Sequence, residues 1–407
     1  MQEPVLIVGA GVVGLTLGQA LKKRDIPFRI FERDSTPTAR GQGWAITLHW
    51  SLPFLREMLP ADIFDRIHGT QVDPINAAND KGNFLFLDLR DCSIKFKIPP
   101  NERWRVNREK MRQTLLSGIE ENVEWGKKVV DARIPEAKDS PATLIFDDGS
   151  KFDGSMIVGV EGSNSTIRQL LSPNDYKNAQ LPIRFLGVGI DMTPFAIAPL
   201  RALDPLLFQG LHPQSRTFMW FSTLETPESN GTAGTVNERY RAQINISWPV
   251  IHPEDEIKST NSEKLAQMKA RASMLDDRLR KVVEGIPDDT LISEIKLADW
   301  ECKNWDNRDG RMTLAGDAAH AMTMYRGEAA NHGLLDALRL CQALEKIQSG
   351  NVGVKVAMDE YEQELRERTS KAVLMSRQAC YDAHTWENLN EGCAVLARRA
   401  INSRSSK

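Results

Sequence analysis

The sequence predicts an α/β fold with three parts: a doubly wound parallel sheet, an inserted and mainly antiparallel β domain, and C-terminal helices. Three patterns lead to this prediction. The apolar run at residues 5–8 is followed at once by glycines and a helical pattern, as in a buried parallel strand. Between residues 181 and 299, imperfectly alternating runs are separated by stretches rich in Pro, Gly, Ser and Asn, which is typical of antiparallel strands. Helical periodicity dominates from Gly333 onward.

The parallel domain begins with a βαβ unit. Residues 5–8 predict a strand, residues 15–23 a helix with apolar side chains at helical spacing, and residues 27–31 a second strand. Helix and strand patterns are mixed over the following residues, and a second wholly buried strand pattern ends near residue 160. The predicted elements of this stretch are helices at 51–67 and 108–119 and strands at 46–48, 83–89, 123–130, 142–146 and 155–160.

The inserted domain is predicted from three strand-like runs and one helix. The strands are expected at 183–190, 217–221 and 242–248, and the helix at 262–283. A buried-strand pattern at 312–315 marks the return to the parallel sheet. We therefore expect a discontinuous domain built on the parallel sheet, an inserted second domain and a C-terminal helical segment whose last residues, 402–407, fray. The domain of the parallel sheet is expected at 1–72, 101–180 and 300–350. The inserted domain is expected at 73–100 and 181–299, and the C-terminal helical segment at 351–407.

Composition excludes several classes of protein. The chain has 407 residues, with 52 Lys and Arg against 55 Asp and Glu, so its net charge of −3 argues against a nucleic-acid binder. Five cysteines without CxxC spacing indicate neither a disulfide framework nor a metal site, and they suit a reducing cytosol. No run reaches the ~18 apolar residues of a membrane helix, and no signal peptide is evident. We expect a cytoplasmic protein, as a monomer or homodimer.

The first chemical motif is a glycine-rich turn between a strand and a helix. In Gly9-Ala-Gly11-Val-Val-Gly14, the first glycine permits the tight turn, the second lets backbone approach a pyrophosphate, and the third lets helix and strand pack closely. Glu32 ends the second strand near the spacing expected for an acid that hydrogen-bonds a ribose. The motif and its context predict a dinucleotide site, and the alternative is a glycine-rich turn in a generic α/β protein.

A second motif lies near the other end of the chain. The strand ending at Leu314 leads into Gly316-Asp317, which places a carboxylate at the C-terminal edge of the sheet, where it could accept from sugar-like hydroxyls. Small residues between positions 327 and 330 would let backbone lie close to a flat ligand. The alternative is a strand, loop and helix with a Gly-rich connection.

Three segments together resemble the FAD-dependent monooxygenases of the para-hydroxybenzoate hydroxylase type. They are GAGVVG with Glu32-Arg33, VGVEGSNSTIR at 158–168, and GDAAHAMTMYRGEAANHG at 316–333. The resemblance covers most of the chain and implies FAD as cofactor and NAD(P)H as co-substrate. It implies that oxygen from O2 is inserted into an aromatic or olefinic small molecule through a C4a-hydroperoxyflavin, with hydroxylation favoured over epoxidation. An aromatic or terpenoid-like substrate from secondary metabolism or aromatic degradation is expected.

The resemblance also assigns residues to the cofactor. It implies that the ADP half is held near the glycine motif, that Asp317 binds the ribityl and pyrophosphate region, and that the backbone from Gly327 to Asn331 lies against the isoalloxazine ring. The middle segment would support the cofactors through Glu161, Gly162 and Arg168. The cofactor-binding residues expected are Gly9, Gly11, Gly14, Glu32, Arg33, Arg108, Asp317, Gly327, Ala330 and Asn331.

Three positions depart from the family pattern. Glu161 stands where the family has Asp, Met324 where Pro is usual, and Ala329 where Gly is usual. Ala329 adds a Cβ beside the expected ring position, which is harmless only where this residue avoids a positive φ. We expect Met324 and Ala329 to leave flavin binding intact, Glu161 to change the detailed contacts of the middle segment, and the departures to affect flavin mobility or substrate scope.

A flavin that carries the chemistry requires few acid or base residues from the protein. The sequence therefore offers few residues to which a catalytic role can be assigned. His49, Tyr325 and Arg326 are the candidates for ionising a phenol, with Tyr240 as a further one. His320 is expected to be a fixed polar residue near the flavin. The aromatic side chains expected to divide between core and pocket wall are Phe218, Trp220 and Phe221.

Two alternatives stay open at this point. One is a flavoprotein that does not oxygenate, such as a reductase, oxidase or halogenase; a halogenase would show Trp-x-Trp-x-x-Ile-Pro, of which only Ile246-Ser-Trp-Pro249 is present. The other is a scaffold that binds or regulates without turnover.

Overall fold

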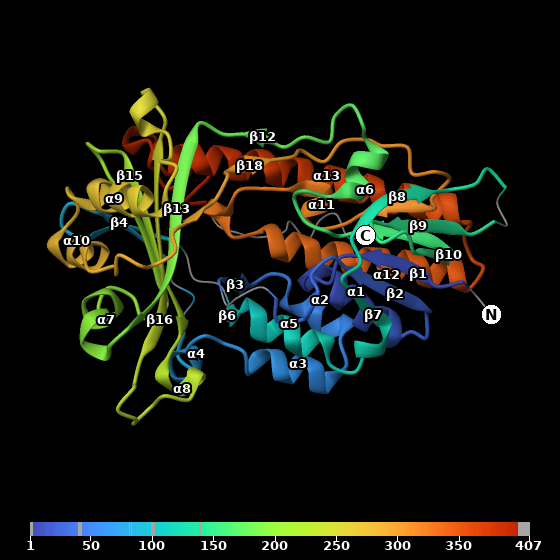
Figure 1. Ribbon diagram of the computed structural model, residues 1–407, viewed down its shortest axis with the longest axis horizontal. Helices are drawn as coiled ribbons and strands as arrows, with labels where there is room; N and C mark the ends of the chain where they lie inside the picture. Colours follow the sequence, from blue (N-terminus) through green and yellow to red (C-terminus); the bar gives the residue numbers. More distant parts are fainter. Residues whose placement is uncertain are drawn as a thin grey trace.

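The computed structural model describes residues 3–39, 43–80, 82, 84–98, 102–137 and 140–397. A parallel sheet with its helices lies at one end of the molecule and a large, mainly antiparallel sheet at the other (Figure 1). The long helix α13 (Val354–Asp382) runs from the first part to the second. This arrangement confirms the predicted fold class. Within the described ranges, no helix combines the length and apolarity needed to cross a membrane.

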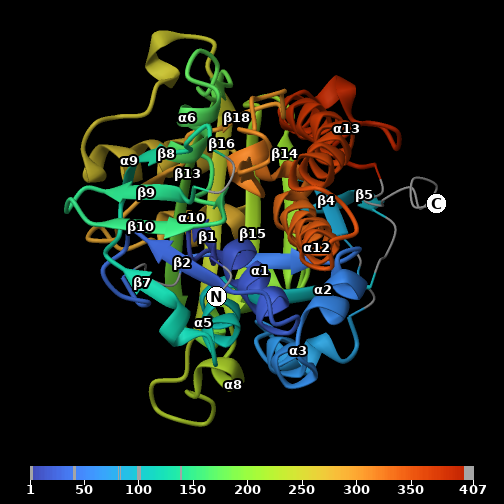
Figure 2. The ribbon, with the colours of Figure 1, turned by 90° about the vertical axis from the view of Figure 1, so that its right-hand side faces the viewer.

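The parallel sheet forms around the apolar strand predicted at the start of the chain. Its strand order is β19 (Met312–Leu314), β11 (Met156–Gly159), β1 (Val5–Val8), β2 (Phe28–Glu32) and β7 (Val123–Trp125). All neighbours pair in parallel, and every side chain of β1 is buried because the strand has a neighbour on each edge and protein on each face. Helix α1 (Val12–Lys22) packs on α12 (Ala329–Gln348) and α5 (Arg108–Leu116), so both chemical motifs begin helices that meet at this sheet (Figure 2).

The second sheet has seven strands. Their order is β17 (Ser293–Glu294), β13 (Ile183–Met192), β16 (Tyr240–Pro249), β15 (Thr217–Glu225), β14 (Leu207–His212), β4 (Phe84–Asp88) and β5 (Ser93–Ile98). All pairs are antiparallel except β14 with β4. Strands from two separate stretches of chain therefore share one sheet, while the domain boundaries themselves stay a prediction.

Three predicted elements were wrong because each is divided in two in the structure. The helix expected at 51–67 is two helices, α2 (Leu52–Met58) and α3 (Ala61–His68), because Pro60 has no N–H with which to continue α2 and takes the N-cap position of α3. The helix expected at 262–283 is α9 (Asn261–Ala272) and α10 (Asp277–Glu284), since Asp276 caps the second one. The strand expected at 123–130 divides into β7 and β8 (Val129–Arg133) around Gly126, whose φ is 70°.

Shorter elements complete the fold. The predicted fraying at 402–407 falls outside the described residues. The remaining strands are β3 (Ala45–Leu48), β6 (Trp104–Asn107), β9 (Ala142–Phe146), β10 (Lys151–Gly154), β12 (Ala179–Gln180) and β18 (Ala298–Asp299). The remaining helices are α4 (Pro74–Ala77), α6 (Thr166–Leu171), α7 (Pro194–Arg201), α8 (Pro227–Asn230), α11 (Asp317–His320) and the 3₁₀ turns η1 (Glu120–Asn122), η2 (Pro253–Asp255), η3 (Met324–Arg326) and η4 (Trp386–Asn388).

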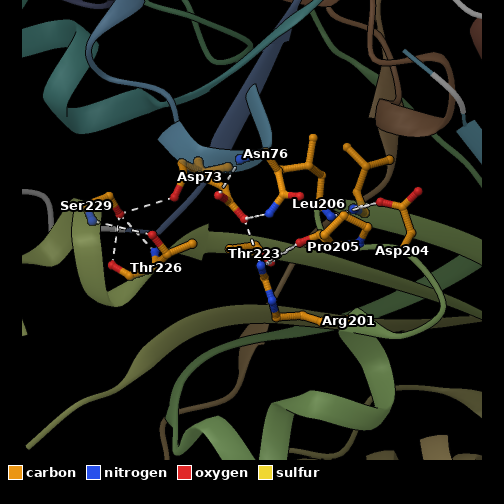
Figure 3. A network of polar contacts seen from close by, with 11 residues as sticks. Asp73, Asn76, Arg201, Asp204, Pro205, Leu206, Thr223, Thr226 and Ser229 are labelled. Carbon is orange, nitrogen blue, oxygen red and sulfur yellow. Dashed lines mark hydrogen bonds and ion pairs between the residues drawn. The ribbon is translucent and has the colours of Figure 1, made fainter. Parts of the chain in front are cut away.

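A buried polar network fixes the large sheet to the chain that enters it (Figure 3). Asp73, which is 1% exposed, caps α4 by accepting from the Asn76 N–H and also accepts from Arg201 at 2.8 Å. Arg201 and Thr223 both donate to the carbonyl of Pro205 at 2.8 Å. These bonds join α4, α7 and β15, so they hold the three elements in place relative to one another.

Candidate functional site

Two cavities meet between the sheets. The first, of about 300 Å³, lies at the carboxyl ends of β1, β2 and β11. The second, of about 350 Å³, lies against the seven-stranded sheet. Ile46, Asp317, Ala329 and Ala330 line both cavities, and we call these four residues the shared wall. The geometry suits an elongated ligand whose one end reaches the second cavity.

The glycine motif forms the floor of the first cavity, and its three glycines serve different purposes. Gly9 has a φ of 115°, and a Cβ there would stand 2.7 Å from the carbonyl oxygen of Val160. A Cβ on Gly14 would stand 2.1 Å from the carbonyl oxygen of Gly9, so helix α1 and strand β1 pack too closely for any side chain. A Cβ on Gly11 would meet nothing within 4 Å. Gly11 therefore leaves room for a ligand over the start of α1.

Glu32 is held at the edge of the first cavity. Its carboxylate accepts from the N–H of Ala10 at 2.8 Å and from the N–H of Asp34 at 3.1 Å, and the residue is 6% exposed. These bonds orient the carboxylate toward the cavity that it lines with Arg33 and Arg108. Lys127 and Lys128 line the same cavity, although the sequence analysis did not single them out.

Glu161, one of the three departures from the family pattern, caps a helix. Its carboxylate accepts from the Ser165 hydroxyl at 2.7 Å and from the Ile167 N–H at 2.9 Å, so it caps the first turn of α6. Burial raises the pKa of Glu161 despite these bonds. Arg168, 2% exposed, donates to the carbonyl oxygens of Asp317 and Ala318. The middle segment thus braces the start of α11, which carries Asp317.

Asp317 stands between the two cavities. Its side chain is exposed to them, and within the described ranges no donor is hydrogen-bonded to its carboxylate. The surrounding protein nevertheless desolvates the group and raises the pKa of Asp317. Asp317 is therefore a free acceptor at the place where the sequence predicted one.

A buried triad holds both ends of α11, the helix that carries Asp317. Asp336 is fully buried and accepts from the Gly316 N–H at 2.7 Å, from His320 Nε2 at 2.6 Å and from Arg368 Nη2 at 2.8 Å. Burial alone would raise the pKa of Asp336, but the charges of His320 and Arg368 outweigh it and hold the pKa well below its usual range. His320, the last residue of α11, is thus bound to a buried carboxylate.

The second cavity is lined by large apolar side chains and by polar groups that come from several elements. Phe218 and Trp220 line it, whereas Phe221 lies in the core, stacked on Phe208 at a centroid distance of 5.1 Å. The other large apolar side chains of its wall are Trp44, Phe84, Ile98, Phe185, Met322 and Met324. Its polar lining includes Arg103, Arg105, Gln243 and Asn245, which the sequence analysis missed.

The candidate catalytic residues lie in different settings. His49, Tyr325 and Arg326 all line the second cavity, whereas Tyr240 lies outside its lining, with the guanidinium carbon of Arg201 4.8 Å from its ring centroid. Arg326 donates to Glu328 at 2.7 Å, so its charge is paired. The catalytic roles of His49, Tyr325 and Arg326 stay predictions.

Tyr325 belongs to a directed hydrogen-bond chain. His384 Nδ1 lies 2.7 Å from the carbonyl of Cys380, so that nitrogen carries the proton and Nε2 accepts from the Ser247 hydroxyl at 2.9 Å. Ser247 then accepts from the Tyr325 hydroxyl, also at 2.9 Å. Burial raises the pKa of Tyr325 well above its usual value and lowers that of His384 to about 4. Both groups are therefore neutral at pH 7.

The start of α12 contains residues that were predicted to lie against the isoalloxazine ring. Gly327 has a φ of 64°, which suits glycine. Ala329 is the first residue of α12, and its φ is not positive. The Ala329 departure therefore causes no backbone strain. Asn331 is fully buried outside both cavity linings, where its side chain bonds to the Thr47 carbonyl and the Ser51 hydroxyl. It ties β3 to α12.

Comparison with known proteins identifies the family. A family model described as "FAD binding domain" matches residues 121–376. The chain is 46% identical over 340 residues to the FAD-dependent monooxygenase dbaB of Emericella nidulans. The aligned residues cover 83% of this chain and 85% of that protein. The chain belongs to the FAD-dependent monooxygenases. This confirms the resemblance read from the three segments.

Two further comparisons extend over nearly the whole monooxygenase. It is 39% identical over 414 residues to the "Probable FAD-dependent monooxygenase" of Arthroderma benhamiae, with 97% of this chain and 95% of that protein covered. The fold is similar to that of Klebsiella pneumoniae HpxO complexed with FAD and uric acid, with a TM-score of 0.72 and 17% identity over 94% of this chain and 89% of that one.

The cavities of this monooxygenase fit FAD. The open space above Gly11 faces the start of an 11-residue helix, where backbone N–H groups favour a pyrophosphate. Glu32 borders the same cavity, the unengaged Asp317 carboxylate follows, and the small side chains of Ala329 and Ala330 leave space at the shared wall. These residues would hold the two ends and the middle of one FAD.

Replacing Asp317 with alanine is expected to weaken FAD binding about 10- to 100-fold, because a charged acceptor contributes roughly 1.5–3 kcal/mol. The melting temperature of the apoprotein should change little, since no protein donor loses a partner. Titration of apoprotein with FAD, followed by flavin fluorescence, measures the affinity. Wild-type affinity in this variant would contradict the assignment.

Proposed function

We propose that this monooxygenase uses NAD(P)H and O2 to insert one oxygen atom into an aromatic or olefinic small molecule, with hydroxylation favoured and epoxidation next. The observation that carries the proposal is the apolar, aromatic-lined second cavity, which opens onto the predicted FAD site through the shared wall. A role in secondary metabolism or aromatic degradation is part of the proposal.

FAD bound between these walls would supply the oxygen-activating chemistry. The protein's own residues position the reactants: Asp317 and the glycine motif would hold the cofactor, while Phe218 and Trp220 would hold a flat substrate and exclude water. His49 lies at the same cavity as a candidate base toward a phenol. The buried Tyr325–Ser247–His384 chain would keep the Tyr325 ring in a fixed place beside the substrate.

Labelled oxygen tests the proposal most directly. The purified protein is reconstituted with FAD and supplied with NADH or NADPH, a panel of phenols and olefins, and ¹⁸O2. We expect faster NAD(P)H oxidation with one class of compound and one ¹⁸O atom in its product. Oxygen converted to hydrogen peroxide with every compound would indicate an oxidase or reductase. Absence of oxygen uptake above background would favour the scaffold.

A further inference from the structure

Arg105 is a buried cation in the wall of the second cavity. It lies on β6, is 6% exposed and borders the cavity on the side of the seven-stranded sheet. Nη1 donates to the Thr47 hydroxyl at 2.9 Å and Nη2 donates to the Ser222 hydroxyl at 2.8 Å. A guanidinium has five N–H donors, so most of its capacity is left for another partner.

No carboxylate among the described residues pairs with Arg105, and its buried Nε has no hydrogen-bond partner there. Burial, followed by the charge of Arg103, lowers the pKa of Arg105 to about 9, so the group is still charged at pH 7. The other two arginines of the cavity differ, because Arg103 is paired with Asp80 at 2.7 Å and Arg326 with Glu328 at 2.7 Å. An uncompensated buried charge is costly and calls for a counter-charge from outside the chain.

The surroundings of Arg105 indicate the form of that counter-charge. Its guanidinium carbon lies 5.8 Å from the centroid of the Trp220 ring, and Ser222 pairs across the sheet with Gln243, which also lines the cavity. Thr47 follows Ile46 of the shared wall. A ligand bound to Arg105 would therefore keep an acidic oxygen among polar groups and its rings among the apolar side chains that lead to the FAD site.

We propose that Arg105 is the specificity-determining residue of this monooxygenase and binds an acidic oxygen of the substrate, either a carboxylate or an ionised phenol. This proposal rests on the proposed function, since it assigns the second cavity to the substrate. It predicts that an aromatic acid binds better than a neutral compound of the same shape.

Pairs of acidic and neutral probes test the proposal in wild-type protein and in Arg105→Met. The carboxylate arm compares 2-naphthoate with 2-naphthamide, and the phenolate arm compares 4-nitrophenol with 4-nitroanisole under mildly alkaline conditions. Binding to the FAD-loaded protein is measured by calorimetry. We expect wild type to favour the acidic member of one pair at least about tenfold, or about 1.4 kcal/mol. Arg105→Met should abolish that preference, and the pair that shows it identifies the kind of acid.

A lysine variant and a stability measurement distinguish a role of Arg105 in binding the acid from a role in stabilising the fold. Arg105→Lys keeps the charge but loses the planar fork, so it should retain part of the preference. Without ligand, Arg105→Met should melt no lower than wild type, because it removes an unpaired buried charge. A much lower melting temperature, an undiminished preference in Arg105→Met, or no preference in wild type would overturn the proposal. If the Arg105 proposal failed in this way, labelled oxygen in a neutral product would still support the proposed function. If instead the acid preference were present and no oxygen were taken up, the proposed function would be contradicted and the Arg105 proposal would stand.

Discussion

Replacing Gly14 with alanine is expected to prevent stable folding. The added Cβ would lie 2.1 Å from the carbonyl oxygen of Gly9 and 2.9 Å from a methyl group of Val160. The carbonyl belongs to the backbone that leaves β1, so it cannot move away without disrupting the centre of the parallel sheet. We expect the free energy of unfolding to fall by about 3 kcal/mol or more. Soluble yield and thermal unfolding followed by circular dichroism measure this.

Gly11→Ala is the matched control three positions earlier. Its Cβ would meet no protein atom within 4 Å, and its φ of −76° is open to alanine, so the variant should fold with a stability within about 1 kcal/mol of wild type. The Cβ would enter the space expected for the pyrophosphate, and FAD affinity should fall at least about tenfold. Wild-type stability of Gly14→Ala, or wild-type FAD affinity of Gly11→Ala, would contradict these assignments.

The parts of the fold that the sequence predicted well are those set by neighbouring residues. Strand β1 and the glycine turn are continuous local signals, so both were located from sequence. Strand β14 was missed because its evidence is not local: Gln209 is fully buried in it, and a Cβ on Gly210 would lie 2.6 Å from the carbonyl oxygen of Leu87. That close approach depends on pairing with a strand more than a hundred residues earlier.

The residues of the site also divide into those indicated by neighbouring residues and those that depend on residues distant in the sequence. Asp317 was predicted because a strand followed by Gly-Asp places a carboxylate at the sheet edge, and the structure puts it there. Arg105 was missed because a buried arginine looks like any other in the sequence. Its hydroxyl partners, Thr47 and Ser222, are 58 and 117 residues away. A weaker signal was available in β16, where Gln243 and Asn245 alternate with apolar residues.

Replacing Asp336 with alanine is expected to lower the free energy of unfolding at pH 7 by about 3–5 kcal/mol, the usual cost of breaking a buried ion pair. The substitution leaves Arg368 and His320 without their shared carboxylate and the Gly316 N–H without its acceptor. Denaturant titration measures the loss. The matched control is Glu360→Ala, because Glu360 joins the same two helices through an exposed pair with Lys346 at 3.7 Å and should cost under about 1 kcal/mol.

The pH dependence of this loss has a definite sign. The pKa of Asp336 is lowered in the folded state, so its contribution is fully present above the ordinary Asp pKa of about 4 and is lost as the pH falls through the folded value. The difference in stability between wild type and Asp336→Ala should therefore be largest above about pH 5 and shrink in acid. A difference below about 1 kcal/mol at pH 7, or one that grows on acidification, would contradict the triad. Because Gly316 is the N-cap residue of α11 and precedes Asp317, the variant should also bind FAD more weakly, which links the stability of α11 to the cofactor that it would position.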